Sequence, residues 1–466
     1  MAEPSKHSWQ GKGAAFLLLF TLMLWLNQSI SSHAWGGLRD RVWKTHTATT
    51  TEVVRYPVVF LYRHSFDEEL YFNLSGEILG KPHDGDFLAG ARMGTGTFAA
   101  TSAPADGKFH APYAEVPLEY PALSLPFLLA PRLFTNSLDG YAFVFSAILG
   151  LTVFGAFTIV LRLVTTHGSA ERTRAYVLAA ALSIAHGALF VQRLDGAVAL
   201  LLACALHFWV RGRFALLGMF LGLAAAFKLT PLLLLLPVVA GDRRLLQHAR
   251  SFLPALAGAT AVGLFPMFLF SRDALTSLLR YHGGRGLHCE STWATLYGLF
   301  SAKPPQATVS YGSLNVDGPI PSLFAKLALP ATLVALALLS LYFFRRRRSG
   351  AERLSALDGV RILVASCIVL WLTSKVFSPQ YLSWAVPLLV PCLLSRRDRL
   401  AALLYGLALV ITQTYFRGYY DAVSGMERIG LVTLLVRDAA LGASAWLLAK
   451  NVGAGESATS FAEHRP

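Results

Sequence analysis

The sequence predicts an all-α polytopic membrane protein, and three observations lead to this fold class. The 466-residue chain is 54% hydrophobic and only 15% charged, whereas soluble proteins carry about 25% charged residues. Long apolar runs alternate with short polar links along most of the chain. The formal net charge is +14, and many of the arginines gather in the links between the runs. This pattern indicates one membrane-embedded bundle instead of several soluble domains.

The apolar runs set the expected number of helices. A helix needs about 20 apolar residues to cross a bilayer, and we expect a bundle of about 12 transmembrane helices. The region 214–240 is divided into two spans because Lys228 and Pro231 interrupt it. The expected spans lie near 14–32, 141–163, 175–191, 195–210, 214–228, 230–240, 252–271, 322–343, 360–374, 379–395, 400–416 and 429–448.

Arginine-rich links decide the predicted orientation. Cytoplasmic links carry an excess of Lys and Arg. Successive links fall on alternating sides of the membrane without conflict when the Arg-bearing links lie inside, namely 171–174, 211–213, 242–250, 345–348 and 396–399. We therefore predict a multi-pass protein of the cell (cytoplasmic or inner) membrane, with an active site on the extracytoplasmic side. The predicted parts are a cytoplasmic N-terminus (1–13), a transmembrane domain (14–450) and a disordered cytoplasmic tail (451–466).

Two long loops are expected on the outside. The first covers 33–140 and the second covers 272–321. The first loop should bear interfacial helices, because the apolar stretch 120–134 is short and contains three prolines. The stretch Ala14–Ile30 also resembles a signal peptide, but we expect it to be retained as the first helix.

Composition excludes several other functions. Each Arg cluster adjoins an apolar run and none is interleaved with aromatic residues, so we expect membrane lipids and no nucleic acid as partners. The four cysteines show no CxxC spacing, which argues against a disulfide framework or a zinc site. No cofactor is predicted with certainty, and the need for a divalent cation stays open.

The first cluster of reactive side chains begins at Arg63. Asp67, Glu68 and Glu69 follow it and precede an apolar segment, which suggests a short helix with acids at its N-terminus. These acids either cap that helix or include a general base that deprotonates a hydroxyl group at the membrane surface.

The second cluster runs from Tyr281 to Trp293. It holds two histidines, three glycines, Arg285 and Glu290, and an arginine there can bind a phosphate through two hydrogen bonds. The alternatives are an Arg285–Glu290 salt bridge in an ordinary loop, or a metal site at His282 and His288.

The third cluster, 374–381, joins two predicted spans through a very short link. Lys375 ends one span, and Gln380 and Tyr381 begin the next. Together with Lys228, Lys375 places positive charge where a lipid-linked phosphate can bind. All three clusters fall on the predicted extracytoplasmic side.

At these positions the chain resembles a membrane glycosyltransferase of the GT-C type, most closely glycosyltransferase family 87. The family-like segments are Asp67 with Tyr71-Phe72, Glu119 to Leu123, Phe227 to Pro231, Tyr281 to Ser291, and Lys375 to Leu382. The second proline commonly expected at position 122 is replaced by alanine.

The resemblance implies a reaction and a set of residues. A hexose, often mannose, would move from a polyprenyl-phosphate sugar to an extracytoplasmic lipid or glycan acceptor, with inversion. Asp67 would be the catalytic base, with Glu68 and Glu69 as alternatives. The expected substrate-binding residues are Arg63, Glu119, Tyr120, Gln192, Lys228, Tyr281, His282, Arg285, Glu290, Ser291, Lys375, Ser378, Gln380 and Tyr381.

A transporter or flippase of a lipid-linked saccharide is the main alternative. It would use the same cationic pocket without an essential acid. Transporters often carry inverted repeats, and no such repeat is evident in this sequence.

Overall fold

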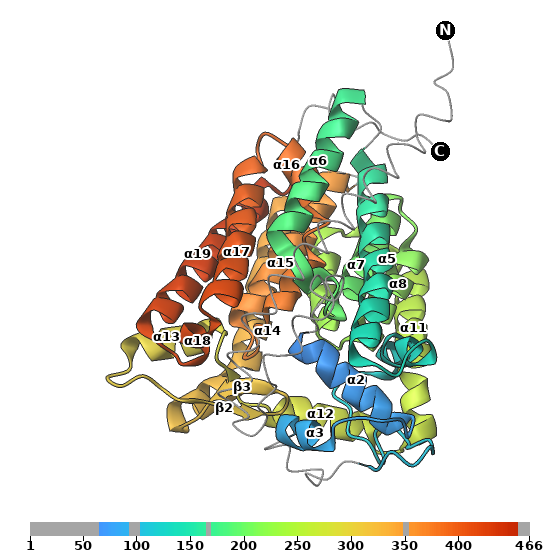
Figure 1. The fold of residues 1–466 in the computed structure, drawn as a ribbon. Coiled ribbons are helices and arrows are strands. Elements are labelled where there is room, and N and C mark those ends of the chain that lie inside the picture. The colour runs from blue at the N-terminus through green and yellow to red at the C-terminus, as the bar shows by residue number, and fades with distance from the viewer. Residues whose placement is uncertain (1–64, 93–102, 165–168, 348–353, 455–466) are drawn as a thin grey trace.

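The computed structural model describes residues 65–92, 103–164, 169–347 and 354–454, and the chain is an all-α polytopic membrane protein (Figure 1). Within these ranges, seven helical segments are long and apolar enough to cross a bilayer. They are α5 (Leu138–Val164), α6 (Ser169–His186) with η5 (Gly187–Phe190), α11 (Ala249–Phe270), α14 (Pro319–Arg346), α15 (Ala356–Thr373), α17 (Arg399–Gly418) and α19 (Arg428–Asn451).

Four other predicted spans form short helices. A break at Lys228 separates α8 (Phe214–Phe227) from the pair η6 (Thr230–Leu234) and α9 (Leu235–Gly241), as predicted. The remaining short helices are α7 (Asp195–Val210), η8 (Pro379–Trp384) and α16 (Leu389–Leu394). Polar contacts join the ends of α7, α8 and η8, because Asp195 accepts hydrogen bonds from both Lys228 and Trp384. Helices α7, α8 and η8 therefore meet at one cluster of hydrogen-bonded polar side chains.

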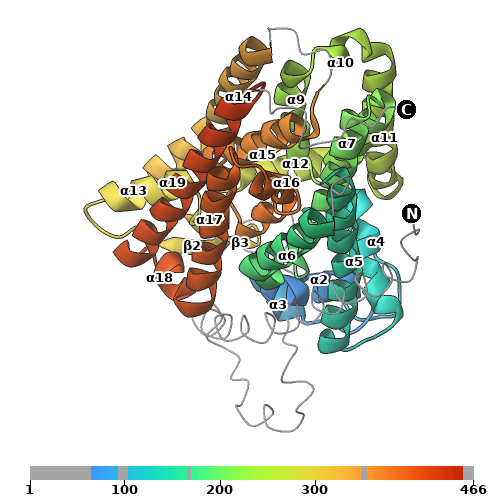
Figure 2. The same cartoon turned by 90° about the horizontal axis from the view of Figure 1, so that it is seen from above.

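Helix α15 is the centre of the bundle. Fourteen of its 18 residues are buried, and it packs against α7, α9, α14, α16 and α19. Seen from above, α15 and α16 lie between the group of α14, α17 and α19 and the group of α7 and α11 (Figure 2). A helix at such a position buries residues on all of its sides, and α15 is apolar at most of them.

Glycines allow α8 and α11 to approach closely. A side chain at Gly218 would collide with the carbonyl oxygen of Phe252, and one at Gly222 with that of Leu256. The spacing of four residues places both glycines on one face of α8, and small residues at this spacing are typical of close helix packing in membranes.

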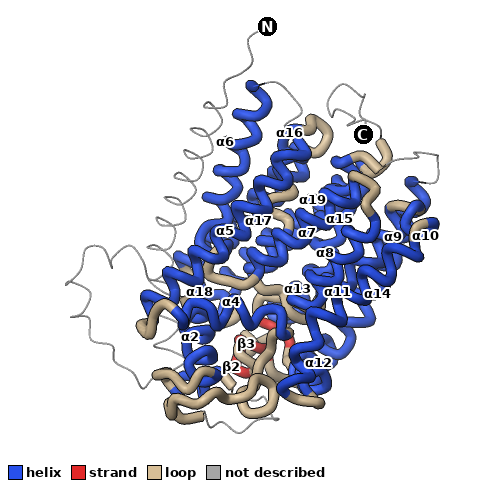
Figure 3. The backbone as a smooth tube through the Cα atoms, turned by 90° about the vertical axis from the view of Figure 1, so that its right-hand side faces the viewer, coloured by secondary structure: helices blue, strands red, loops and turns tan. Residues whose placement is uncertain are grey.

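The loops at one end of the bundle contain short helices and a small sheet (Figures 1 and 3). In the sheet, β1 (Leu287–His288) and β2 (Ala307–Ser310) both pair antiparallel with the central strand β3 (Ser313–Val316). Tyr311 and Gly312 form the β2–β3 turn with φ values of 52° and 66°, as the twist of a two-residue hairpin demands. The helices here are α2 (Phe66–Ile78), α3 (Gly85–Ala91), η3 (Ala122–Ser124), α4 (Leu125–Leu129), η4 (Ala130–Leu133), α12 (Ala274–Gly284), α13 (Thr292–Phe300) and α18 (Tyr420–Ser424).

Arginine-bearing links lie at the other end. There α10 (Arg244–Gln247) joins α9 to α11, and Arg361 binds Asp358 and Asp398 with nitrogen–oxygen distances of 3.0 and 2.7 Å. The predicted N-terminus (1–13), the first span (14–32) and Arg63 lie outside the described residues, as does most of the tail, because the description ends at residue 454.

Candidate active site

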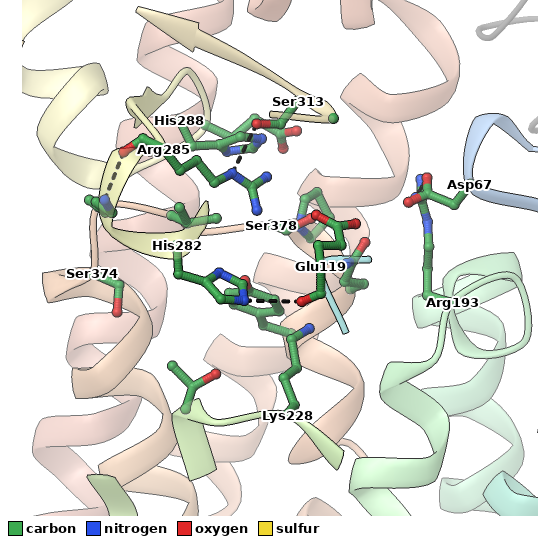
Figure 4. Close-up of a pocket in the computed structure, with 18 of the residues that line it drawn as sticks. Asp67, Glu119, Arg193, Lys228, His282, Arg285, His288, Ser313, Ser374 and Ser378 are labelled. Carbon is green, nitrogen blue, oxygen red and sulfur yellow. Dashed lines mark hydrogen bonds and ion pairs between the residues drawn. The ribbon is translucent and has the colours of Figure 1, made fainter. Parts of the chain in front are cut away.

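A cavity of about 740 Å³ opens where the short helices end, and the three predicted clusters meet around it (Figure 4). Its walls come from α2, the link before α7, the α8–η6 break, α12, the small sheet, α14 and the link 374–379. Twelve of the predicted site residues line it: Asp67, Glu119, Tyr120, Gln192, Lys228, His282, Arg285, Glu290, Lys375, Ser378, Gln380 and Tyr381.

Arg285 and Lys375 form a cationic corner of this cavity. Arg285 Nε donates to Ser313 Oγ at 3.0 Å, which fixes the plane of the guanidinium group. Lys375 Nζ donates to the carbonyl oxygens of Arg285 at 2.7 Å and Gly283 at 3.0 Å. Burial and the neighbouring guanidinium group lower the pKa of Lys375 to about 8. Both cations line the cavity and lie close enough for their charges to interact, as is expected of an anion site.

Lys228 supplies a third cation to the cavity. Its Nζ donates to Asp195 Oδ1 at 2.8 Å and lies 4.2 Å from the centre of the Tyr381 ring. Trp384 Nε1 donates to the same carboxylate oxygen at 2.6 Å. These contacts hold the ammonium group at the break after α8, where a free lysine would adopt many rotamers.

Glu119 is fixed from two sides by α12. Tyr281 donates its hydroxyl to Glu119 Oε2 at 2.7 Å and also contacts the carbonyl oxygen of Tyr311 at 2.5 Å. His282 Nε2 hydrogen-bonds the carbonyl oxygen of Glu119 at 3.1 Å, and burial lowers the pKa of this histidine to about 4. Tyr281 therefore positions a cavity residue, and it does not line the cavity itself.

The three acids of α2 have three different surroundings. Asp67 lines the cavity and forms an ion pair with Arg193. Glu68 forms a capping box with Ser65, with its Oε2 accepting from the Ser65 N–H at 2.7 Å, and its Oε1 accepts from Ser146 at 3.0 Å. Glu69 lines a separate surface cavity on another face of α2. The interpretation of the acids as helix caps is thus correct for Glu68, while Asp67 is the one aimed at the cavity.

Glu290 belongs to a buried polar network and not to the alternative Arg285 salt bridge. Tyr415 and Tyr420 donate their hydroxyls to its two carboxylate oxygens, and Arg437 Nη1 lies 3.8 Å from Oε2. Burial raises the pKa of Glu290, and the nearby Arg437 opposes that shift. Arg285 instead bonds Ser313, so the predicted Arg285–Glu290 alternative is wrong.

Ser291 has a structural place beside the cavity. Its hydroxyl caps α13 by accepting from the N–H of Ala294 at 3.2 Å. It lies outside the cavity lining. A serine followed by a helical segment is a recognisable capping signal, so the sequence contained the information for this role.

His282 and His288 are the two candidate metal ligands of the second cluster. Among the described residues, no group of three or more His, Cys, Asp or Glu side chains is arranged to hold a metal ion. His282 is used in a hydrogen bond to Glu119, and both imidazoles are buried close enough to Arg285 for its charge to lower their pKa.

Sequence reasoning missed several polar residues of the cavity, among them Arg193, Ser313, Lys326 and Tyr420, and considered His288 only as a metal ligand. Arg193 follows the predicted Gln192, and His288 lies within the second cluster, so both had a positional signal. Ser313 had none, because its contact with Arg285 depends on how the β2–β3 hairpin folds back.

Comparison with known families gives one assignment. The model of glycosyltransferase family 87 matches residues 119–379, which is more than half of the chain and includes Glu119, Lys228, Arg285 and Lys375. A search of curated proteins found no match to this chain.

Proposed function

The chain belongs to glycosyltransferase family 87, and we propose that it transfers a hexose from a polyprenyl-phosphate sugar to an extracytoplasmic lipid or glycan acceptor. Family membership makes it a membrane glycosyltransferase with a sugar donor and an acceptor. The proposal adds the polyprenyl-phosphate donor, the kind of acceptor and inversion at the anomeric carbon, with mannose as the first sugar to test.

One observation carries the proposal: a single cavity contains both a carboxylate and a cationic corner. Asp67 lines one part of it, and Arg285 and Lys375 line another. Figure 4 places Asp67 and Arg285 on opposite sides of the view. Inverting transfer needs a base on the acceptor side of the anomeric carbon and positive charge on the leaving-group side, and this arrangement provides both.

The chemical step follows from these positions. The Asp67 carboxylate takes the proton of the acceptor hydroxyl while that oxygen forms a bond to the anomeric carbon. The bond from this carbon to the phosphate oxygen breaks, and its electron pair leaves with the polyprenyl phosphate. Arg285, Lys375 and Lys228 stabilise the negative charge that develops on the phosphate. Because Arg193 pairs with Asp67, the acceptor hydroxyl has to share this carboxylate with the arginine.

Exposed apolar residues that line the cavity on α12 and α14 support a lipid-linked donor. Leu279 on α12 and Leu329 on α14 line the cavity and are 54% and 58% exposed. Lys326, one helical turn before Leu329, also lines the cavity. A polyprenyl chain leaving between α12 and α14 would remain in the hydrocarbon region while its phosphate reaches Arg285. This exit would use the apolar side chains that line the cavity on α12 and α14.

We further propose that the cavity faces the extracytoplasmic side of the cell membrane. The links of 242–250 and 396–399 lie at the end of the bundle opposite α2, α12 and the sheet (Figures 1 and 3). Positive links favour the cytoplasm, so the loop regions 33–140 and 272–321 and the interfacial segment 120–134 belong outside. The transmembrane domain would then be 14–450, with the flanks 1–13 and 451–466 in the cytoplasm.

The test is sugar transfer by the purified full-length protein in proteoliposomes, with radiolabelled polyprenyl-phosphate hexoses and a crude lipid-glycan extract. We expect a labelled product with inverted anomeric configuration, and a loss of about 100-fold in Arg285→Gln because a charge-assisted phosphate contact disappears. Arg280→Gln, an exposed position on α12, is the matched control. Movement of labelled lipid between leaflets without any product would instead identify a flippase.

A further inference from the structure

Three buried polar atoms of the cavity wall lack a hydrogen-bond partner within the described ranges. They are Gln192 Nε2, Arg193 Nε and His288 Nδ1. Their residues are 1%, 9% and 6% exposed, respectively. Most buried polar side-chain atoms in proteins have a partner, and leaving one without a partner costs about 1–3 kcal/mol. The three side chains line one cavity, so a bound molecule toward which they rotate can complete these hydrogen bonds.

These three side chains lie beside the two chemical parts of the cavity. Gln192 and Arg193 are neighbours in the chain, and Arg193 pairs with Asp67. His288 is close enough to Arg285 for the guanidinium charge to influence the imidazole, and both appear together in Figure 4, across the view from Arg193. A ligand that reaches from the cationic corner to Asp67 has to pass these atoms.

His288 acts as a hydrogen-bond acceptor in this position. Burial and the neighbouring Arg285 lower its pKa to about 3, so the imidazole is neutral at ordinary pH. It hydrogen-bonds the backbone of Phe377, and because Nδ1 is the nitrogen without a partner, that bond uses Nε2. A neutral imidazole that donates through Nε2 accepts through Nδ1. The wall therefore offers one acceptor and two donors.

The mixture of donors and acceptors identifies the class of ligand. A phosphate accepts hydrogen bonds only, and the nearby carboxylates of Asp67 and Glu290 disfavour an anion here. A lipid chain makes no hydrogen bonds. Hydroxyl groups both donate and accept, and a sugar ring carries several of them in fixed directions.

We propose that this part of the cavity is a subsite for a hexose ring, in which Gln192 and Arg193 donate to ring hydroxyls and His288 accepts from one. The inference rests on the proposed function and adds the residues that select the sugar. Either the transferred hexose or the terminal sugar of the acceptor presents this chemistry, and the experiment separates the two.

The test measures binding and not only turnover. Full-length wild type, Gln192→Leu and His288→Asn are titrated in nanodiscs with polyprenyl-phosphate mannose and with polyprenyl phosphate that lacks the sugar. One lost neutral hydrogen bond corresponds to about 3- to 10-fold in affinity, so Gln192→Leu should weaken binding of the sugar-bearing donor by that factor and leave the bare lipid phosphate unchanged. His288→Asn, which keeps an acceptor near Nδ1, should retain most of the affinity, whereas His288→Leu should not.

Matched controls and a second arm complete the experiment. Gln306→Leu changes an exposed glutamine outside the cavity and should leave all affinities unchanged. If Gln192→Leu instead raises the KM for the acceptor glycan and leaves donor affinity intact, the subsite holds the acceptor sugar, and the proposal stands.

Equal affinity of wild type and of properly folded Gln192→Leu and His288→Leu for donor, bare lipid phosphate and acceptor would overturn the hexose subsite. A failure of the proposed function has a different signature. In that case the wild type transfers no sugar from any donor, while sugar-dependent binding and its loss in Gln192→Leu remain measurable.

Discussion

Lys228 and Asp195 form an ion pair with a nitrogen–oxygen distance of 2.8 Å at the point where α8 ends and α7 begins. The Asp195 side chain is 2% exposed and the Lys228 side chain is 16% exposed, at the edge of the cavity. The pair links two short helices to η8, because Trp384 donates to the same carboxylate oxygen. A charge that a ligand can reach is thus supported by a partner that is almost completely buried.

Removing Asp195 should therefore destabilise the fold. Asp195→Ala leaves the Lys228 ammonium group without its buried partner and the Trp384 indole N–H without an acceptor. Breaking a buried ion pair from one side costs about 3–5 kcal/mol, so we expect a lower Tm for the purified protein in detergent. Asp273→Ala, at an exposed position before α12, is the control. Equal Tm values for the two variants would show that the pair contributes little to stability.

Lys375 should give the activity an alkaline limit near pH 8. Its pKa is lowered to about 8, so the ammonium group loses its proton as the pH rises through that value, and the donor phosphate loses a cation. The kcat/KM for the donor reports groups of the free enzyme, and we expect it to fall above pH 8.

Lys375→Arg separates this residue from other titrating groups. The guanidinium group keeps its charge at all pH values used, so the alkaline decline should move to higher pH even if the maximal rate is lower. An unchanged alkaline decline in Lys375→Arg would assign it to another group.

The proposed lipid exit between α12 and α14 predicts an effect that depends on lipid length. Leu329→Trp places a large side chain at the exit, so the KM should rise for long polyprenyl donors and much less for a donor with a short isoprenoid chain. Leu333→Trp, 46% exposed one turn further along α14 and outside the cavity lining, should behave as wild type. An equal rise of KM for short and long donors would argue against this exit path.

Glu68 should matter for stability and not for catalysis. It caps α2 and accepts from Ser146. Since glutamine also serves in a capping box, Glu68→Gln should cost about 1 kcal/mol in stability and retain transfer. A large loss of transfer in a variant with wild-type donor binding would assign the base to Glu68.

The acids of α2 show what the sequence can and cannot predict. Their position at a helix N-terminus followed from the pattern of residues. Successive side chains on a helix differ in direction by about 100°, so Asp67, Glu68 and Glu69 cannot share one environment. Which of them faces the cavity depends on the rotation of α2 against α5, and that rotation is set by tertiary packing.

The number of spans shows a similar limit. Hydrophobicity predicted where helices occur and also the break at Lys228, because proline and charge interrupt an apolar run. It did not distinguish a full span from the short helices α7, α8 and α9. Long-range contacts such as Arg285 with Ser313 cannot be predicted from the local sequence pattern.

The most direct test is the transfer rate of Asp67→Asn with a saturating polyprenyl-phosphate donor, measured beside wild type and Glu68→Gln. The substitution keeps the size of the side chain and removes its ability to accept a proton. General base catalysis contributes about 10²- to 10⁴-fold, so we predict a loss of that order with donor affinity retained. Transfer by Asp67→Asn at the wild-type rate would contradict the account.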